Sequence, residues 1–225
     1  MTTEAVARYS SSEELANAIT HGLGIVLSIA ALAILTGFAS AYGEARHVIG
    51  VSVFGASLVL LYTASTLYHS IPSPRAKEVL RALDHSFIFV LIAGTYTPFC
   101  LVTLQGVWGW GLFAFVWSLA VIGIICRLWL GRKSGTASVI VYLLMGWSIV
   151  PAFKPLMASI SSLGLWLMVA GGIAYTGGVV FYVWRKLTYH HAIWHLFVLA
   201  GSMLHFFAIL LAVVPGARET LAALC

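Results

Sequence analysis

Four side chains of the kind that bind or assist a metal ion stand at the borders of apolar segments. Asp84, the one aspartate in the chain, opens a long apolar segment, and His69 lies fifteen residues before it. His191 and His195 are spaced i,i+4, so on a helix they project from one face about a turn apart. Such groups are costly in an apolar environment unless they coordinate something, which makes these four the candidate functional residues.

The chemistry that fits these residue types is that of a zinc-activated water. Three neutral imidazoles match the ligands of a catalytic zinc site, so we assign His69, His191 and His195 as metal ligands for Zn²⁺. Zinc lowers the pKa of a bound water toward neutrality. Asp84 is then the carboxylate that orients or deprotonates the water, with direct coordination as the alternative. Ser65, one helical turn before His69, is a candidate donor to a polarised carbonyl oxygen.

Further polar residues border the same positions. Asn17 and His21, one turn apart, could line the vestibule of the site; for Asn17, contact with the site and helix N-capping both stay open. His205 lies ten residues after His195, about 15 Å along a helix, so we expect it to serve helix packing or a second site. Three histidines are poorer candidates by direction or by side of the membrane: His47, His85 and His190.

The composition places all these residues in a membrane protein. Hydrophobic residues make up 61% of the 225 residues and charged residues 8%, whereas a soluble domain carries about 25% charged residues. Continuous apolar runs near or above the length of a membrane span favour helices over an alternating β-barrel. We therefore predict one domain, an all-α bundle of seven transmembrane helices.

The predicted spans lie between the charged residues of the chain. A tail over 1–17 precedes the membrane domain, 18–214, and a short external tail over 215–225 follows it. The seven spans are 18–41, 48–70, 84–104, 107–129, 136–154, 160–184 and 191–214. The segment SIPSPRAKEVLRAL is then a loop that joins the second and third helices.

The basic residues orient this bundle. Nine of the twelve lie in the N-terminal tail and the even-numbered loops, which predicts a cytoplasmic N-terminus and an external C-terminus. His69, Asp84, His191 and His195 then share one depth near the inner leaflet. The net charge of +5 reflects this topology and contact with anionic lipids, and nucleic-acid binding is not indicated. The nine residues are Arg8, Arg75, Lys77, Arg81, Arg127, Arg132, Lys133, Arg185 and Lys186.

A stripe of small residues marks the sixth predicted helix. Gly171, Gly172, Gly177 and Gly178 with Ala174 would allow a neighbouring helix to approach closely in lipid. We interpret the stripe as a packing surface.

Four segments together resemble the hemolysin III family, the bacterial branch of the progestin and adipoQ receptors. They are EELANAITHGLG (13–24), STLYHSIP (65–72), LDHSFIFVLIAGTYTPF (83–99) and HHAIWHLFVLAGSMLHF (190–206). The resemblance implies a seven-helix protein with its N-terminus inside and a zinc ion held by one histidine of helix two and two of helix seven, which match His69, His191 and His195. An aspartate of helix three, matching Asp84, is reached through water, and Ser65 matches a serine one turn before the first ligand.

Three functions follow from the residues and the resemblance. The wider superfamily, with its alkaline ceramidases, implies a zinc-dependent hydrolase of a lipid amide or ester that enters from the inner leaflet of a bacterial inner membrane. The alternative is a non-enzymatic membrane regulator or receptor in which zinc is structural. A pore-forming cytolysin, which the family name suggests, is disfavoured because seven continuous apolar spans cannot easily travel as a soluble toxin.

Overall fold

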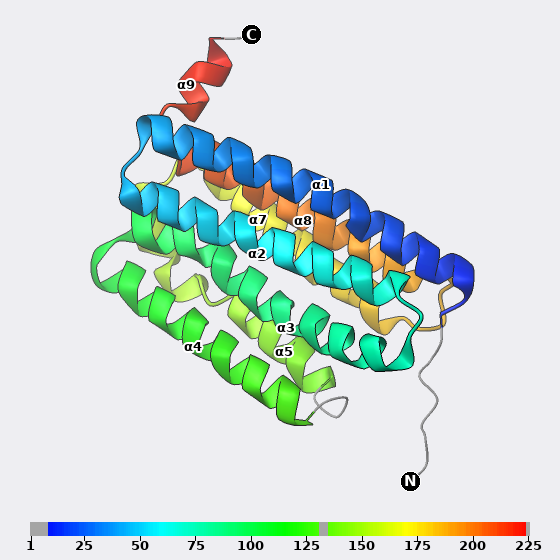
Figure 1. Ribbon diagram of the computed structural model, residues 1–225. Coiled ribbons are helices and arrows are strands. Elements are labelled where there is room, and N and C mark those ends of the chain that lie inside the picture. The colour runs from blue at the N-terminus through cyan, green and yellow to red at the C-terminus, as the bar shows by residue number, and fades with distance from the viewer. Residues whose placement is uncertain (1–8, 131–134, 224–225) are drawn as a thin grey trace.

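The chain folds into a bundle of long helices, as seen in a computed structural model that describes residues 9–130 and 135–223 (Figure 1). Seven helical stretches are long and apolar enough to cross a membrane, and the described residues contain no strand. This confirms the predicted all-α bundle of seven membrane helices. The elements are α1 Ser11–Tyr42, α2 Ala45–Ser70, α3 Pro74–Pro98, η1 Phe99–Leu104, α4 Gly106–Leu130, α5 Gly135–Gly146, η3 Val150–Ala152, α6 Phe153–Ser159, α7 Ser162–Val183, α8 His190–Ala212 and α9 Ala217–Ala222.

Two helices begin well before the residues predicted from charge and hydropathy. α1 starts at Ser11 rather than 18, because Ser10 and Glu13 form a capping box in which each side chain bonds the other's main-chain N–H. α3 starts at Pro74 rather than 84, with proline at its first position, where no N–H donor is needed. The predicted loop SIPSPRAKEVLRAL is therefore wrong, since most of it forms the first turns of α3. Asp84 lies inside the helix, almost three turns from its start.

The other spans differ less from their predicted bounds. α2 and α8 agree within three residues at each end, and the fifth span continues beyond 154 through η3 and α6 to Ser159. The predicted external tail contains the short helix α9. Arg132 and Lys133, used to predict the orientation, lie outside the described residues, as do 1–8 and 224–225.

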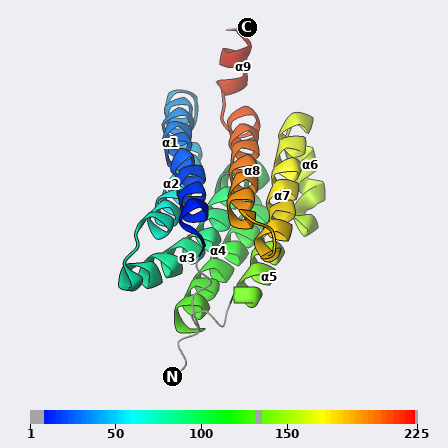
Figure 2. The same ribbon diagram turned by 90° about the vertical axis from the view of Figure 1, so that its right-hand side faces the viewer.

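α8 lies between α1 and α7 in the bundle. Seen from the end at which α1 and α8 begin, these three helices lie above α3, α4 and α5 (Figure 2). One buried apolar cluster joins α1, α2 and α8, and a second joins α3, α4, α5 and α6. The site described below lies at the end of the bundle where α1 and α8 begin and α2 ends.

The glycine stripe of α7 makes a close helix contact, as predicted. A methyl group on Gly171 would come within 2.5 Å of the His205 ring on α8, and one on Gly178 within 2.8 Å of Phe197. At Gly172 the nearest atom would be 3.8 Å away. Gly171 and Gly178 therefore let α7 pack against α8.

Candidate metal centre

Three histidines from two helices meet at one end of the bundle. His69 lies in the last turn of α2, and His191 and His195 lie in the first two turns of α8. One ligand atom from each ring lies within 4.8 Å of the others, and all three side chains are buried. Their ring centroids are 4.5 to 5.2 Å apart. The fold thus brings together the three residues selected from the sequence as metal ligands.

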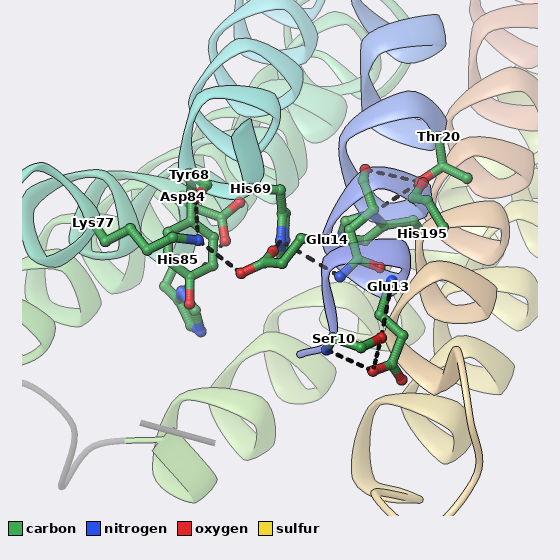
Figure 3. A network of polar contacts seen from close by, with 12 residues as sticks. Ser10, Glu13, Glu14, Thr20, Tyr68, His69, Lys77, Asp84, His85 and His195 are labelled. Atoms are coloured by element: carbon green, nitrogen blue, oxygen red, sulfur yellow. Dashed lines mark hydrogen bonds and ion pairs between the residues drawn. The ribbon is translucent and has the colours of Figure 1, made fainter. Parts of the chain in front are cut away.

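The ring of His69 is fixed by a carboxylate from α1. Its Nδ1 lies 2.6 Å from Oε2 of Glu14, and because a carboxylate only accepts, Nδ1 carries the proton and donates it (Figure 3). The second oxygen of Glu14 accepts from Lys77 Nζ at 2.7 Å. The remaining nitrogen of His69, Nε2, is buried without a partner among the described residues. Its lone pair is available to a metal ion.

The ring of His195 is fixed in the same way by main-chain and hydroxyl oxygens of α1. Its Nδ1 lies 3.2 Å from the carbonyl oxygen of Asn17 and 3.1 Å from Oγ1 of Thr20. A carbonyl oxygen only accepts, so Nδ1 is again the protonated nitrogen. Nε2 of His195 is buried and has no partner in the described part of the chain. α1 thereby sets the same tautomer in a histidine of α2 and a histidine of α8.

His191 is held by ring packing instead of by a hydrogen bond. Neither of its nitrogens has a partner among the residues described, and the side chain is buried. Its ring packs between Tyr9 and Trp194, with centroids 5.1 and 4.9 Å away. The packing fixes the ring position and leaves both nitrogens open to a ligand.

Asp84 lies near His69 and outside the ligand set of the three histidines. Its carboxylate is 2% exposed and interacts electrostatically with His69, but the mutually close ligand atoms come from the histidines alone. Ser65, fully buried on α2, faces Asp84, and its hydroxyl makes no hydrogen bond of ordinary length within the described residues. His85 Nδ1 lies 3.5 Å from the carboxylate. The position suits a carboxylate that works through a water molecule.

Asn17 and His21 both lie against the histidine cluster. The His21 ring stacks on His195 with centroids 3.4 Å apart, and the Asn17 amide nitrogen lies 3.5 Å from His69 Nδ1. Both side chains are 1% exposed. Because Ser10 caps α1, the capping alternative for Asn17 is wrong. Both residues therefore belong to the surroundings of the site.

The histidines judged to be poorer ligands have other partners. Nδ1 of His190 donates to the carbonyl oxygen of Phe181 at 3.0 Å, and Nδ1 of His85 donates to that of Arg81 at 2.9 Å. Nε2 of His205 donates to the Met168 carbonyl oxygen at 3.0 Å, where α8 packs on α7. His47 accepts from the Glu44 main chain at the opposite end of α2.

Three contributors to the site escaped the sequence analysis: Tyr9, Glu14 and Thr20. Glu14 shares a helical face with Asn17 and His21, three and seven residues later. A helix predicted to start at 18 leaves Glu14 outside, so the shared face cannot be seen. Tyr9 precedes the helix, and its ring lies 6.1 Å from that of His69 and 5.1 Å from that of His191. Burial raises the pKa of the Tyr9 phenol, which keeps this side chain neutral beside the histidines.

The donor set fits a zinc ion. Unpartnered polar atoms are rare in protein interiors because each loses its hydrogen bonds to water. Here such nitrogens come from three buried rings that lie together. The oxygen contacts to Nδ1 of His69 and His195 are of the kind that orient zinc-bound histidines. Zinc accepts this combination of three imidazoles and leaves a further coordination position open.

Comparison with known proteins agrees with the family resemblance found in the sequence. A family profile described as "Haemolysin-III related" matches residues 9–206. The protein named "Hemolysin-3" from Bacillus cereus is 51% identical over 91% of this chain and 94% of its own length. "Hemolysin-3 homolog" from Bacillus subtilis is 50% identical over 90% of this chain and 95% of its own length. The human "Monocyte to macrophage differentiation factor" is 30% identical over 88% of this chain and 83% of its own length.

Proposed function

Since the chain belongs to the haemolysin III family and spans a membrane, we propose that it is a zinc-dependent hydrolase of a lipid amide or ester. The observation that carries the proposal is the set of buried, unpartnered nitrogens on His69, His191 and His195, with the Asp84 carboxylate near His69. A purely structural polar core would pair these atoms with each other or with the main chain.

Each residue of the site has its own role in hydrolysis. His69, His191 and His195 would hold the zinc ion, which would supply Lewis acidity and lower the pKa of a water molecule toward neutrality. Asp84 accepts the proton of the attacking water and returns it to the leaving amine or alcohol. Ser65, whose hydroxyl faces the Asp84 carboxylate, donates to the carbonyl oxygen as negative charge develops. Glu14 and Thr20 hold two of the rings in place.

A largely apolar cavity supports the choice of a lipid as substrate. It has a volume of about 130 Å³ and lies between α3, α5, α7 and α8. Its wall includes His21 and Trp194, the rings that pack against His195 and His191, so it reaches the neighbours of the cluster. Aliphatic side chains such as Ile88, Leu91 and Val198 line it further along. An acyl chain in this cavity would have its polar head toward the histidines.

The proposed location is the bacterial inner membrane, with the site at the inner leaflet. The excess of basic residues on the N-terminal side supports this orientation, and the bundle places all three histidines at that same end. A lipid of the inner leaflet would then reach the cavity laterally.

The test is turnover of defined lipids by the purified protein. A fluorescent ceramide supplies the amide bond and a fluorescent phosphatidylcholine supplies the ester bonds, each presented in detergent micelles. We expect release of fatty acid from one of them, loss of this activity on chelation, and recovery with added zinc. Turnover that persists in the fully metal-free protein would overturn the proposal.

A second candidate is a membrane regulator in which zinc only ties helices together. One observation favours it: the cavity wall contains the neighbours of the three histidines and not the histidines themselves. In that case zinc would join α2 to α8 and stabilise the fold without any lipid being consumed. No turnover in the native protein, combined with a zinc-dependent melting temperature, would favour the regulator over the enzyme.

A further inference from the structure

Lys77 on α3 forms the outer end of a chain of polar contacts that leads to the metal centre. Its Nζ donates to Oε1 of Glu14 at 2.7 Å, and Oε2 of the same carboxylate accepts from His69 Nδ1 at 2.6 Å (Figure 3). The side chains of Lys77 and Glu14 keep 25% and 23% of their surface exposed, whereas that of His69 is fully buried. The carboxylate therefore bridges a group near the surface and a buried candidate ligand.

Two contacts with Tyr68 fix the ammonium group of Lys77 in turn. Nζ donates to the Tyr68 carbonyl oxygen at 3.0 Å and lies 4.9 Å from the centroid of the Tyr68 ring. Tyr68 lies in the last turn of α2, and the helical donor for its carbonyl would come from Pro72, which has no N–H. A positive charge is also favourable at the C-terminal end of a helix. The end of α2 thus holds Lys77 where it presents a defined donor to Glu14.

The Glu14 carboxylate needs a second donor to keep its orientation toward His69. A glutamate side chain has several rotatable bonds, and ordering it costs conformational entropy. Because this carboxylate is partly exposed, water competes with His69 Nδ1 for its oxygens. Within the described residues, Lys77 and His69 are the two side chains that donate to it, one to each oxygen. The charge-assisted bond from Lys77 therefore restricts the carboxylate to the orientation in which it bonds His69.

We propose that Lys77 is a positioning residue of the metal centre, which holds Glu14 in the orientation that fixes the His69 ring for metal binding. This assignment rests on the metal centre of the proposed function and is independent of the reaction performed there. Contacts that orient a zinc-bound histidine change metal affinity by about 10- to 100-fold. Lys77 acts one contact further from the metal, so we place its effect at the lower value, about tenfold.

The zinc affinity of purified K77M tests the proposal, because methionine keeps an unbranched side chain and removes the ammonium group. Two explanations of the contact predict opposite signs. If Lys77 positions Glu14, the zinc affinity falls about tenfold. If Lys77 contributes only a positive charge, which repels a divalent cation, its removal raises the zinc affinity. Competition with a chromophoric chelator measures the affinity. An unchanged or increased affinity in K77M would overturn the proposal.

A double-mutant cycle with E14A shows whether the effect passes through the carboxylate. E14A removes both oxygens that join Lys77 to His69, so adding K77M should cause no further loss of zinc affinity. An equal loss with and without the carboxylate would mean that Lys77 acts by stabilising the fold, and this would overturn the assignment. The melting temperatures of the zinc-free proteins report whether each variant is folded. The comparison of K77M with the native protein stands even if the double variant does not fold.

Two further variants separate the contact from the charge. K77R keeps a donor for the carboxylate and should bind zinc nearly as tightly as the native protein. R75M removes a positive charge from an exposed position of α3 two residues earlier and should also bind zinc like the native protein. A loss in K77R or R75M as large as that in K77M would contradict the proposal. A native protein that binds no zinc would remove the metal centre itself, whereas zinc binding that is unaltered in K77M would refute the role of Lys77 alone.

Discussion

Two sets of buried histidines in this bundle differ in what their nitrogens contact. His190 and His205 each donate to a carbonyl oxygen of the main chain on α7, so one ring nitrogen holds the helices together. His69 and His195 donate to groups on α1 and direct a bare nitrogen into a shared space. The two sets share residue type and burial. His190, His195 and His205 all lie on α8, and only His69 lies on α2. The difference shows that a candidate ligand is recognised by an unpartnered nitrogen that lies within 4.8 Å of those of two other histidines, which the unpartnered Nδ1 of His205 does not.

The contrast extends to the neighbouring carboxylates. Glu13 and Glu14 are adjacent in sequence, yet Glu13 caps α1 and accepts from the Tyr189 main chain, whereas Glu14 bonds His69. Adjacent residues of a helix point about 100° apart, so Glu13 caps the helix while Glu14 contacts the metal centre. The predictions below exploit such matched pairs.

The largest expected effect is on catalysis, through Asp84. Replacing Asp84 with asparagine keeps the size of the side chain and removes the proton acceptor. We expect lipid turnover to fall by about 10²- to 10⁴-fold while zinc content stays the same. Activity and bound metal are measured on the same preparation. Unchanged turnover would remove Asp84 from the mechanism.

Removal of the metal should destabilise the protein through His69, His191 and His195 alone. At zinc concentrations near a hundredfold above Kd, binding contributes about 2.7 kcal/mol to stability, so chelation should lower the melting temperature. H190A should still respond to chelation, because His190 serves helix packing. An unchanged melting temperature of the native protein after verified removal of zinc would count against a metal that joins α2 and α8.

Glu14 and Glu13 test whether the hydrogen bond to His69 Nδ1 supports metal binding. E14Q weakens the acceptor for His69 Nδ1, and we expect zinc affinity to fall by about 10- to 100-fold. E13Q, one residue away, alters the cap of α1 and should leave zinc affinity nearly unchanged. Competition with a chromophoric chelator measures both. Equal losses in the two variants would mean that Glu14 acts only through helix stability.

The smallest expected effect concerns His205, which donates to the main chain of α7. G171A would place a methyl group within 2.5 Å of the His205 ring, and we expect a loss of about 1–3 kcal/mol in unfolding free energy with full zinc content. G172A meets its nearest atom at 3.8 Å and should be nearly neutral. Denaturant unfolding in mild detergent compares the two. Loss of zinc in G171A would show that the two histidine sets are coupled.

The seven helices could be predicted because composition and uninterrupted apolar runs follow directly from the membrane as solvent. Helix starts could not be located by charge counting. α1 and α3 begin in polar sequence, where Ser10 with Glu13 and Ser73 with Pro74 carry the local signals. Charge counting therefore puts Asp84 at the start of its helix, whereas it lies well inside α3.

The three histidines could be selected because topology brings the end of α2 and the start of α8 together at one depth. Asp84 could be selected as the one aspartate of the chain, although it lies almost three turns inside α3. Glu14 and Thr20 could not, since their role depends on which ring nitrogen they meet across the contact between α1 and the rest of the bundle.

The most direct test of the account is the zinc content of three purified proteins: native, H195A and H190A. His195 and His190 are both buried at the start of α8, and only His195 has an unpartnered nitrogen beside His69 and His191. We predict about one zinc per chain in the native protein and in H190A, and almost none in H195A. Equal zinc content in all three, whether full or absent, would contradict the account.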